Sequence, residues 1–366
     1  LLVKRILMLV ATSVATDTRV LREARSLISD GHEVSIIGRD VPEGFTFAKI
    51  KIFSATGGKG LRRDSGSLTA RKLPQHLRLV RWILLPQHRE KAFSTWRTNA
   101  YEIAKNLNFD VIHVHDFNAL ELGVRLSTEK QVPFIYDSHE WWLGRQRQYR
   151  PTPRIDRKEA QQERDWAKQA RAVITVGEGI AELFKRERDV KNVFVVRNSF
   201  PLSAPGHVAS PPTGIVYAGR IDAYRELETI FSAASEIPLK ILLMGEHKNE
   251  WANQKLPGAK AKGIQVSDAK SIEEVTNQMR QAGLAFVTHS NKFESHRLAL
   301  PNKLFHAVHA GVPVIATNVS ELAKIVTKYD LGEIYEPSNP VSMAAAVKRA
   351  TVSYTHLRAH ETDSIS

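Results

Sequence analysis

Residues 300–316 read LPNKLFHAVHAGVPVIA. Proline is favoured in the first turn of a helix, as at Pro301, and glycine commonly follows the last turn, as at Gly311. The pattern therefore predicts a helix over residues 301–310 that leads at once into a buried strand over residues 312–316. The free N–H groups and the dipole at the start of such a helix favour an anion. A helix joined directly to an apolar strand is typical of α/β proteins.

The same alternation extends along the chain. In the first half we expect strands at residues 5–10, 33–37, 111–114, 134–136, 172–176 and 193–196, with helices at 18–29, 160–170 and 178–188. In the second half we expect strands at 214–218, 239–244, 263–266, 284–288 and 312–316, with helices at 225–235, 271–282, 301–310 and 340–350. Continuous apolar runs are typical of parallel strands that are buried on both faces. The sequence thus predicts two Rossmann-like, doubly wound parallel-sheet domains.

The 366 residues are about twice the length of an ordinary domain. A stretch rich in Pro, Ser and Gly without hydrophobic periodicity, residues 199–213, is predicted to be a linker. It separates an N-terminal domain, residues 1–198, from a C-terminal domain, residues 214–351. Residues 352–362, VSYTHLRAHET, resemble a translated sequencing adapter. We therefore expect residues 352–366 to be a non-native tail.

The charge of the chain is unevenly distributed. The net charge is +13, and residues 1–200 hold 35 Lys and Arg against 23 Asp and Glu. Residues 51–100 alone hold 11 against 2. Such an excess predicts an anionic partner for the N-terminal half.

Several classes of protein are disfavoured. The chain has no cysteine, which excludes disulfide scaffolds and thiol catalysis. The loop after the first strand, residues 11–17, has no glycine, so a dinucleotide-binding turn is not expected there. No P-loop, zinc-protease helix or serine-hydrolase elbow is present, and no run approaches the ~18 apolar residues of a membrane span.

A polar loop follows the first strand of the predicted second domain. Residues 218–228 read AGRIDAYRELE, which places Arg220 and Arg225 five residues apart across a strand-to-helix turn. Guanidinium groups bind phosphate in a bidentate manner, so the two side chains could hold one anion. The alternative is that both are solvated surface residues.

Taken in order, several blocks resemble the glycosyltransferases of the two-Rossmann GT-B architecture, in particular the Pro-Asn-Lys subgroup of the retaining family 4. In the N-terminal half the blocks are DTRVLREA (17–24), GHEV (31–34), FDVIHVHD (109–116), YDSHE (136–140), AVITV (172–176) and VRN (196–198). In the C-terminal half they are GR (219–220), PNKLF (301–305) and AGVPVIA (310–316). The resemblance covers residues 4–350 and implies two domains that face a cleft.

The resemblance implies roles in binding a nucleotide-sugar donor. Arg220 and Arg225, beside Gly219, match the positions that hold the diphosphate and stabilise it as it leaves. The backbone from Leu300 through Pro301 to Lys303 is expected to bind the same phosphates, and Asn302 and Lys303 are expected to contact the donor. The resemblance implies no metal and no other cofactor.

In the N-terminal half, His139 matches a histidine that contacts the donor sugar or the acceptor hydroxyl, and Glu140 could supply that contact instead. The alternative for His139 is a structural histidine in a turn. Asp17, Arg19 and Asp116 belong to the motifs expected on the acceptor side.

The sequence departs from the family pattern at three positions. Many members carry two glutamates separated by seven residues, and these positions here are Leu298 and His306. Glu294 is an alternative source of the missing carboxylate, and His306 could still bond a ribose hydroxyl. Glu226 stands where the family commonly has glycine. These departures leave open a catalytically degenerate relative.

We therefore expect a retaining, metal-independent glycosyltransferase that transfers a sugar from a nucleoside-diphosphate sugar to a glycan or lipid-linked acceptor, in the synthesis of cell-envelope polysaccharide. The alternatives are a glycan- or membrane-binding relative without activity, and a nucleotide-sugar epimerase of the same fold.

Basic residues interleaved with Leu and Trp in residues 59–98 are typical of a surface that binds anionic lipid. The alternative is a pair of helices with one face in the core and one face in solvent. We expect a cytoplasmic protein, peripheral on the inner face of the membrane, and no nucleic acid partner.

Overall fold

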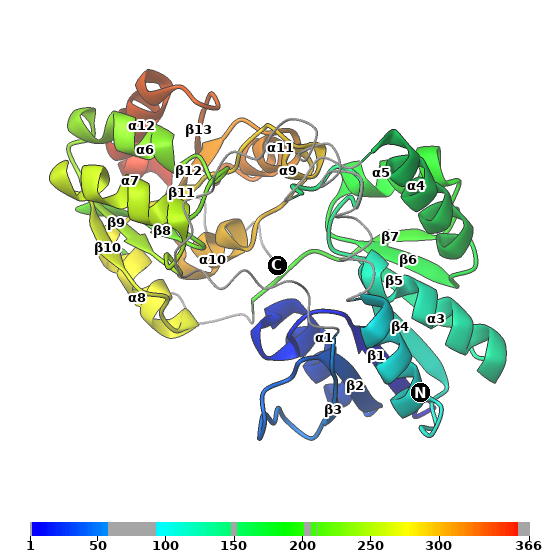
Figure 1. Cartoon of the computed structure of the whole chain (residues 1–366). Helices are drawn as coiled ribbons and strands as arrows, with labels where there is room; N and C mark the ends of the chain where they lie inside the picture. The colour runs from blue at the N-terminus through cyan, green and yellow to red at the C-terminus, as the bar shows by residue number, and fades with distance from the viewer. Residues whose placement is uncertain (1, 58–92, 148–151, 201–205, 210, 358–366) are drawn as a thin grey trace. The chain divides into compact units, whose positions relative to one another are not determined.

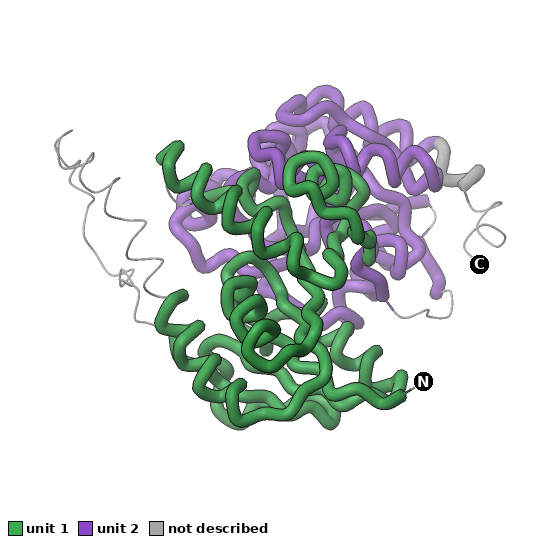
Figure 2. Tube along the Cα trace, turned by 90° about the vertical axis from the view of Figure 1, so that its right-hand side faces the viewer, with its two compact units in different colours: residues 1–196 green, residues 197–366 purple. Residues whose placement is uncertain are grey.

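The computed structural model describes residues 2–57, 93–147, 152–200, 206–209 and 211–357 (Figure 1). The chain divides into two compact units, residues 1–196 and residues 197–366 (Figure 2). The described part of each unit contains one sheet, and every pair of neighbouring strands in it is parallel. The predicted α/β fold with two doubly wound parallel sheets is therefore confirmed.

In unit 1 the described residues form a sheet of seven strands in the order β3-β2-β1-β4-β5-β6-β7. The strands are β1 (Arg5–Val10), β2 (Glu33–Arg39), β3 (Lys51–Ala55), β4 (Val111–His115), β5 (Phe134–Ser138), β6 (Ala172–Thr175) and β7 (Val193–Val195). The helices are η1 (Val14–Thr16), α1 (Thr18–Ser29), residues 93–104, α3 (Phe117–Lys130), α4 (Pro153–Ala167) and α5 (Glu178–Arg188). The order is that of a Rossmann-like sheet with one added strand.

In unit 2 the described residues form a sheet of six strands in the order β10-β9-β8-β11-β12-β13. The strands are β8 (Gly214–Ala218), β9 (Lys240–Met244), β10 (Gln265–Ser267), β11 (Ala285–Val287), β12 (Val314–Thr317) and β13 (Gly332–Tyr335). The helices are α6 (Leu227–Ala233), η2 (Ala234–Glu236), α7 (Glu250–Ala261), α8 (Ile272–Ala282), α9 (Glu294–Arg297), α10 (Asn302–Ala310), α11 (Ser320–Lys328) and α12 (Pro340–Leu357). Apolar residues of the sheet and its helices form two buried clusters, on which the unit depends for its stability.

The central strands are apolar because helices cover both faces of the sheet. In β1, Leu7, Met8 and Leu9 are fully buried, and in β12 all four residues are buried. Polar side chains therefore concentrate where the strands end, as expected for parallel sheets. The register places His115 of β4 beside Asp137 of β5 at that edge.

Several predicted boundaries differ from the structure. The helix predicted at residues 301–310 begins at Asn302, and Pro301 is its N-cap with extended backbone. The pattern missed β3, β13, residues 93–104, α3, α7, α9 and α11. The sequence pattern does not predict α7, because Pro257 lies inside this helix and proline is unfavourable in a helix interior.

Two predicted segments fall partly outside the described residues. The predicted linker, residues 199–213, lies in unit 2, and its residues 201–205 and 210 are outside the described ranges. Of the predicted tail, residues 352–357 continue α12, whereas residues 358–366 are outside the described ranges.

Most of the basic segment 59–98 also lies outside the described residues. In its described part, residues 93–98, Trp96 is fully buried and Arg97 forms an ion pair with Glu121 at 2.9 Å. These residues therefore pack into unit 1. Among the described residues, no helix has the length and apolarity needed to cross a membrane.

The loops that follow β8 and β9 pack against each other through glycine. The Gly219 N–H donates to the carbonyl oxygen of Met244 at 2.9 Å. A Cβ atom placed on Gly245 would lie 1.9 Å from the carbonyl oxygen of Gly219. Any larger residue at position 245 would thus displace the backbone that precedes Arg220.

We predict that Gly245→Ala lowers the free energy of unfolding by about 2–3 kcal/mol, because overpacking against backbone cannot be relieved by a rotamer change. Gly258→Ala is a matched control, since a Cβ atom there meets nothing within 4 Å; in a helix it should be neutral or stabilising by up to ~1 kcal/mol. Denaturant unfolding of both variants checks this. Equal stability of the two variants would contradict the packing argument.

Candidate active site

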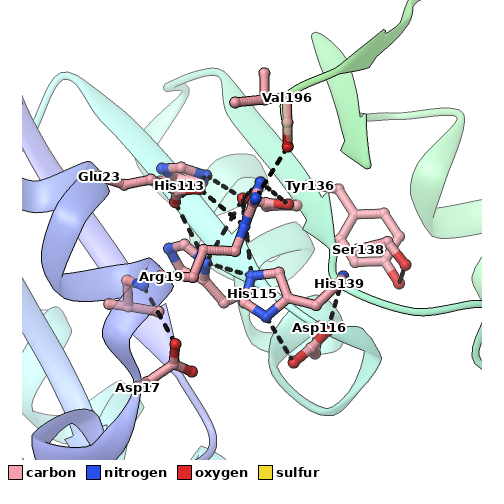
Figure 3. A network of polar contacts seen from close by, with 12 residues as sticks. Asp17, Arg19, Glu23, His113, His115, Asp116, Tyr136, Ser138, His139 and Val196 are labelled. Atoms are coloured by element: carbon pink, nitrogen blue, oxygen red, sulfur yellow. Dashed lines mark hydrogen bonds and ion pairs between the residues drawn. The ribbon is translucent and has the colours of Figure 1, made fainter. Parts of the chain in front are cut away.

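Unit 1 carries a cluster of polar residues where α1 meets the ends of β4 and β5 (Figure 3). His113 and His115 point to the same face of β4, because alternate residues of a strand share a face. We call this the unit 1 cluster; its members are Arg19, Glu23, His113, His115, Asp116, Asp137 and His139. All but Glu23, Asp116 and His139 are buried.

Bonds from Arg19 to two carboxyl groups hold the cluster together. One guanidinium nitrogen, Nη2, lies 3.0 Å from Asp137 Oδ2, and Nε lies 2.9 Å from Glu23 Oε1. Arg19 also donates to the carbonyl oxygen of Val196 at 2.9 Å. Because Arg19 is 6% exposed, it is placed to fix the carboxylates and offers little surface to an acceptor.

Two of the three carboxyl groups of the cluster, those of Glu23 and Asp137, have pKa values that are shifted in opposite directions. Burial and the nearby charge of Asp137 raise the pKa of Glu23 far above its ordinary value. Burial opposes ionisation of Asp137 as well, but His113, His139 and Arg19 together outweigh it and lower the pKa of that carboxyl. Near neutral pH the cluster therefore holds Asp137 ionised and Glu23 protonated.

His139 lies between two partners. Its Nδ1 is 3.4 Å from Asp116 Oδ2, and its Nε2 is 3.2 Å from His115 Nδ1. The His139 backbone N–H also donates to Asp116 Oδ1 at 3.1 Å. The side chain remains 18% exposed, so one edge can meet a substrate while Asp116 fixes the orientation of the ring.

The remaining acceptor-side predictions have local roles. Asp17 caps α1, since its Oδ1 accepts from the Val20 N–H at 3.2 Å. Glu140 accepts from the Ser138 hydroxyl through its backbone carbonyl at 2.9 Å.

No roles were predicted from the sequence for four members of the cluster, Glu23, His113, His115 and Asp137. The alternation of two histidines on β4 was the available signal.

Unit 2 carries a second polar group, built around two basic side chains. Lys303, in the first turn of α10, is buried; its Nζ donates to the carbonyl oxygen of Thr288 at 2.6 Å and lies 4.5 Å from the ring centroid of Tyr217. Burial, and next the charge of Arg225, lower the pKa of Lys303 well below its ordinary value. Among the described residues, no carboxylate oxygen lies within 4.0 Å of Arg225 or Lys303. We call these two residues, with His289 and His296, the unit 2 basic site.

The two histidines of this site are uncharged. Their ring centroids are 4.4 Å apart, and both Nδ1 atoms are buried without a hydrogen-bond partner among the described residues. Burial and the charges of Arg225 and Lys303 lower the pKa of His296 to about 4 and that of His289 well below its ordinary value. Neither residue was predicted from the sequence.

The two predicted arginines differ in their surroundings. The Arg220 side chain is 58% exposed and pairs with Asp222 at 3.2 Å. Arg225 lies beside the buried Lys303, and its carbonyl oxygen accepts from the Thr288 hydroxyl at 2.6 Å. The structure therefore places Arg225, more than Arg220, in an environment that favours an anion.

Glu226 occupies a conformation that suits glycine. Its φ of +60° and ψ of 21° are left-handed, which costs a non-glycine residue about 1 kcal/mol. Its carboxylate compensates by accepting from the Ser338 N–H at 2.7 Å, the Ser338 hydroxyl at 3.2 Å and the Thr229 hydroxyl at 2.9 Å. These bonds fix the turn that carries Arg225.

His306 stands at the position of a family glutamate, but one of its ring nitrogens already contacts α8. Its Nε2 lies 2.9 Å from Thr276 Oγ1 and 3.2 Å from the carbonyl oxygen of Ile272, both on α8. The ring stacks on Phe200 with centroids 5.0 Å apart. The predicted bond to a ribose hydroxyl would therefore have to use Nδ1.

The other predicted donor residues lie at the ends of α9 and α10. Glu294 begins α9, and Leu298 is its C-cap. Leu300 is buried in the core, whereas Asn302 is exposed at the start of α10. The free N–H groups of this first turn remain suitable for an anion.

His296 makes stability depend on pH. Its pKa is lower in the folded than in the unfolded chain, so acid favours the unfolded state. Between pH 7 and pH 5 we predict that the free energy of unfolding falls by about 2 kcal/mol through this residue. His296→Asn should remove that part of the dependence, and His207→Asn, a control in the same unit, should not. Denaturant unfolding of all three proteins at both pH values checks this; an unchanged slope in His296→Asn would contradict it.

Comparisons with solved structures agree with this architecture. The chain is similar to sucrose-phosphate synthase from Thermosynechococcus elongatus, with 14% identity and a TM-score of 0.71 over 96% of this chain and 90% of that one. It is similar to Anabaena HepE in complex with UDP and glucose, with 13% identity and a TM-score of 0.63 over 97% and 91%. WaaG, a glycosyltransferase involved in lipopolysaccharide biosynthesis, gives 12% identity and a TM-score of 0.65 over 96% and 91%. At these identities the likeness shows the GT-B fold.

Family models match both units. Glycosyltransferase Family 4 matches residues 16–203, and Glycosyl transferases group 1 matches residues 212–351. A search of curated proteins gave no match. The first model covers more than half of the chain, and the chain belongs to glycosyltransferase family 4.

Proposed function

We propose that the protein is a retaining hexosyltransferase that moves a sugar from a nucleoside-diphosphate sugar to a glycan or lipid-linked acceptor, without a metal ion at the diphosphate. The unit 2 basic site carries this proposal. Arg225 and Lys303 lack a carboxylate partner among the described residues and adjoin two uncharged histidines. A diphosphate would supply the missing negative charge.

The site suits a departing nucleoside diphosphate. Negative charge grows on the diphosphate as the sugar leaves, and fixed cations stabilise it most where water is excluded. A bound diphosphate would also raise the pKa of Lys303 again, because an opposite charge favours the ammonium form. The first turn of α10 would add N–H donors. Anabaena HepE, a neighbour of the same fold, has been solved with UDP-glucose, which supports a donor of this class.

His139 is the proposed contact of unit 1 with the sugar or the acceptor hydroxyl. Its exposed edge and its fixed Nδ1 suit a residue that orients a hydroxyl group. Catalysis would then rest on orientation by unit 1 and on charge stabilisation by unit 2.

We predict that Arg225→Ala weakens binding of the cognate nucleoside diphosphate about 10–100-fold, the loss expected for one or two charge-assisted hydrogen bonds, and lowers kcat/KM at least as much. Arg220→Ala should have a smaller effect, because that side chain is largely exposed and already paired. Arg349→Ala, which removes an exposed arginine of unit 2 paired with Glu333, is the control.

Calorimetric titration with UDP, GDP and ADP, followed by turnover of the corresponding sugar nucleotides, checks this. The anomeric configuration of the product, read by NMR, tests retention. Unchanged affinity in Arg225→Ala would contradict the assignment of the site, and an inverted product would contradict the retaining mechanism.

A binding protein without transferase activity is the second candidate. Leu298 and His306 stand where many family members have glutamates, and Nε2 of His306 already contacts α8. Nucleotide binding without transfer to any acceptor would favour this candidate. Turnover of the donor without an acceptor would favour an epimerase instead.

The acceptor proposal extends to the membrane. We propose a role in cell-envelope polysaccharide synthesis at the cytoplasmic face, because residues 51–100 hold 11 Lys and Arg against 2 Asp and Glu. Such a charge excess favours anionic lipid by about 1 kcal/mol for each basic residue near the surface.

We predict that the chain sediments with phosphatidylglycerol vesicles and not with phosphatidylcholine vesicles at low salt. Replacing Arg78, Arg81 and Arg89 by Gln should reduce the bound fraction several-fold, whereas Arg349→Gln should not. Equal binding to both lipids, or no loss in the triple variant, would contradict the proposal.

A further inference from the structure

We propose that the unit 1 cluster contains a binding site for one divalent transition-metal cation such as Zn²⁺, with Glu23, His113, His115 and Asp137 as ligands. The site is independent of the diphosphate proposal, because its ligands all belong to unit 1 whereas the unit 2 basic site lies in the other unit.

The four ligand atoms converge on one point. Glu23 Oε2, His113 Nε2, His115 Nδ1 and Asp137 Oδ2 all lie within 4.8 Å of one another. His113 Nε2 is 3.6 Å from Asp137 Oδ2 and 4.0 Å from Glu23 Oε2. His115 Nδ1 is 3.9 Å from each of the same oxygens. Tetrahedral zinc with bonds of about 2.0–2.1 Å requires ligand atoms roughly 3.4 Å apart. The four ligand pairs given above are longer than this by about 0.2–0.6 Å, so the side chains must move closer together when a cation binds.

Unpaired polar atoms provide an independent observation. Glu23 Oε2 and His113 Nε2 are buried and have no hydrogen-bond partner among the described residues. The His113 side chain is only 9% exposed. A buried acceptor without a partner costs about 1–3 kcal/mol, and both of these atoms point toward the same place. A cation bound there would satisfy them together.

The donor set suits metals of intermediate softness. Two imidazole nitrogens and two carboxylate oxygens favour Zn²⁺, Co²⁺ or Ni²⁺ over Mg²⁺ or Ca²⁺, which prefer oxygen alone. The ligands come from three elements, α1, β4 and β5, which are secured by their own packing and pairing. The cation would therefore connect the helix to the sheet.

Arg19 opposes the cation and shares one proposed ligand atom with it, Oδ2 of Asp137. The guanidinium bonds Glu23 through Oε1, at 2.9 Å, and leaves Oε2 free. It bonds both oxygens of Asp137 at 3.0–3.1 Å. Binding of a cation would displace the proton of Glu23, and the two carboxylates would then outweigh the single charge of Arg19.

Metal binding would alter the surroundings of His139. His115 Nδ1 now lies 3.2 Å from His139 Nε2. Coordination uses the lone pair of His115 Nδ1, which would release His139 Nε2 for a substrate hydroxyl.

The test uses the full chain without an affinity tag, stripped with EDTA and dialysed. Zn²⁺ is titrated against a chromophoric chelator, and Co²⁺ is followed by its visible absorption, which reports the coordination geometry. We expect one ion per chain and a higher midpoint of thermal unfolding with Zn²⁺.

Glu23→Gln and His113→Ala should each weaken Zn²⁺ binding at least tenfold. His32→Ala, a control histidine in the same unit outside the cluster, should bind as the wild type does. Glu23→Gln preserves the size of the side chain and its bond to Arg19, so it gives the answer even if His113→Ala fails to fold.

Absence of stoichiometric Zn²⁺ binding in the wild type, or equal affinity in Glu23→Gln, would overturn the proposal. Nucleoside-diphosphate binding, measured on the same samples with and without EDTA, should not change. Failure of every sample to bind a nucleoside diphosphate, with Zn²⁺ binding intact, would contradict the proposed function and leave the metal-site proposal standing.

Discussion

Every pair of neighbouring strands in the described part of both sheets is parallel, and this constraint determines where chemistry can occur. The interiors of the strands are buried on both faces, so they accept apolar side chains, as Leu7, Met8 and Leu9 of β1 show. Polar side chains are tolerated where the strands end, and all parallel strands end at the same edge. The two polar groups described above lie at or near such an edge, one in and after β4 and β5 and the other after β8 and β11.

The balance of charge distinguishes the two groups. In unit 1, Arg19 meets Asp137 and Glu23, and the cluster is nearly neutral as a whole. In unit 2, Arg225 and Lys303 meet His289 and His296, which burial and the basic neighbours keep uncharged. Burying basic groups without a counter-ion is costly. A ligand that supplies negative charge would offset this cost. The bonds from Glu226 to Ser338 and from Thr288 to the backbone of Arg225 hold the turn in place.

The sequence predicts the architecture well and the site only in part. Apolar runs and helix periodicity reveal the parallel sheets because these patterns reflect burial directly. Arg225 and Lys303 are recognisable because they follow a strand and begin a helix. The spacing in the sequence does not distinguish Arg220 from Arg225. The structure shows that Arg220 pairs with Asp222, whereas Arg225 lies beside the buried Lys303. His289 and His296 are missed because their low pKa depends on neighbours that tertiary folding supplies, and the unit 1 cluster is missed because Glu23 and Asp137 are 114 positions apart in the chain.

The central claim is that unit 2 recognises the diphosphate of its ligand through charge. Calorimetry of the full chain with a nucleoside, its monophosphate and its diphosphate, for uridine, guanosine and adenosine in turn, tests this most directly. The account predicts that for one base the diphosphate binds at least 100-fold more tightly than the nucleoside, about 2.7 kcal/mol, and that added salt reduces the difference. Equal affinity for nucleoside and diphosphate in all three series would contradict it.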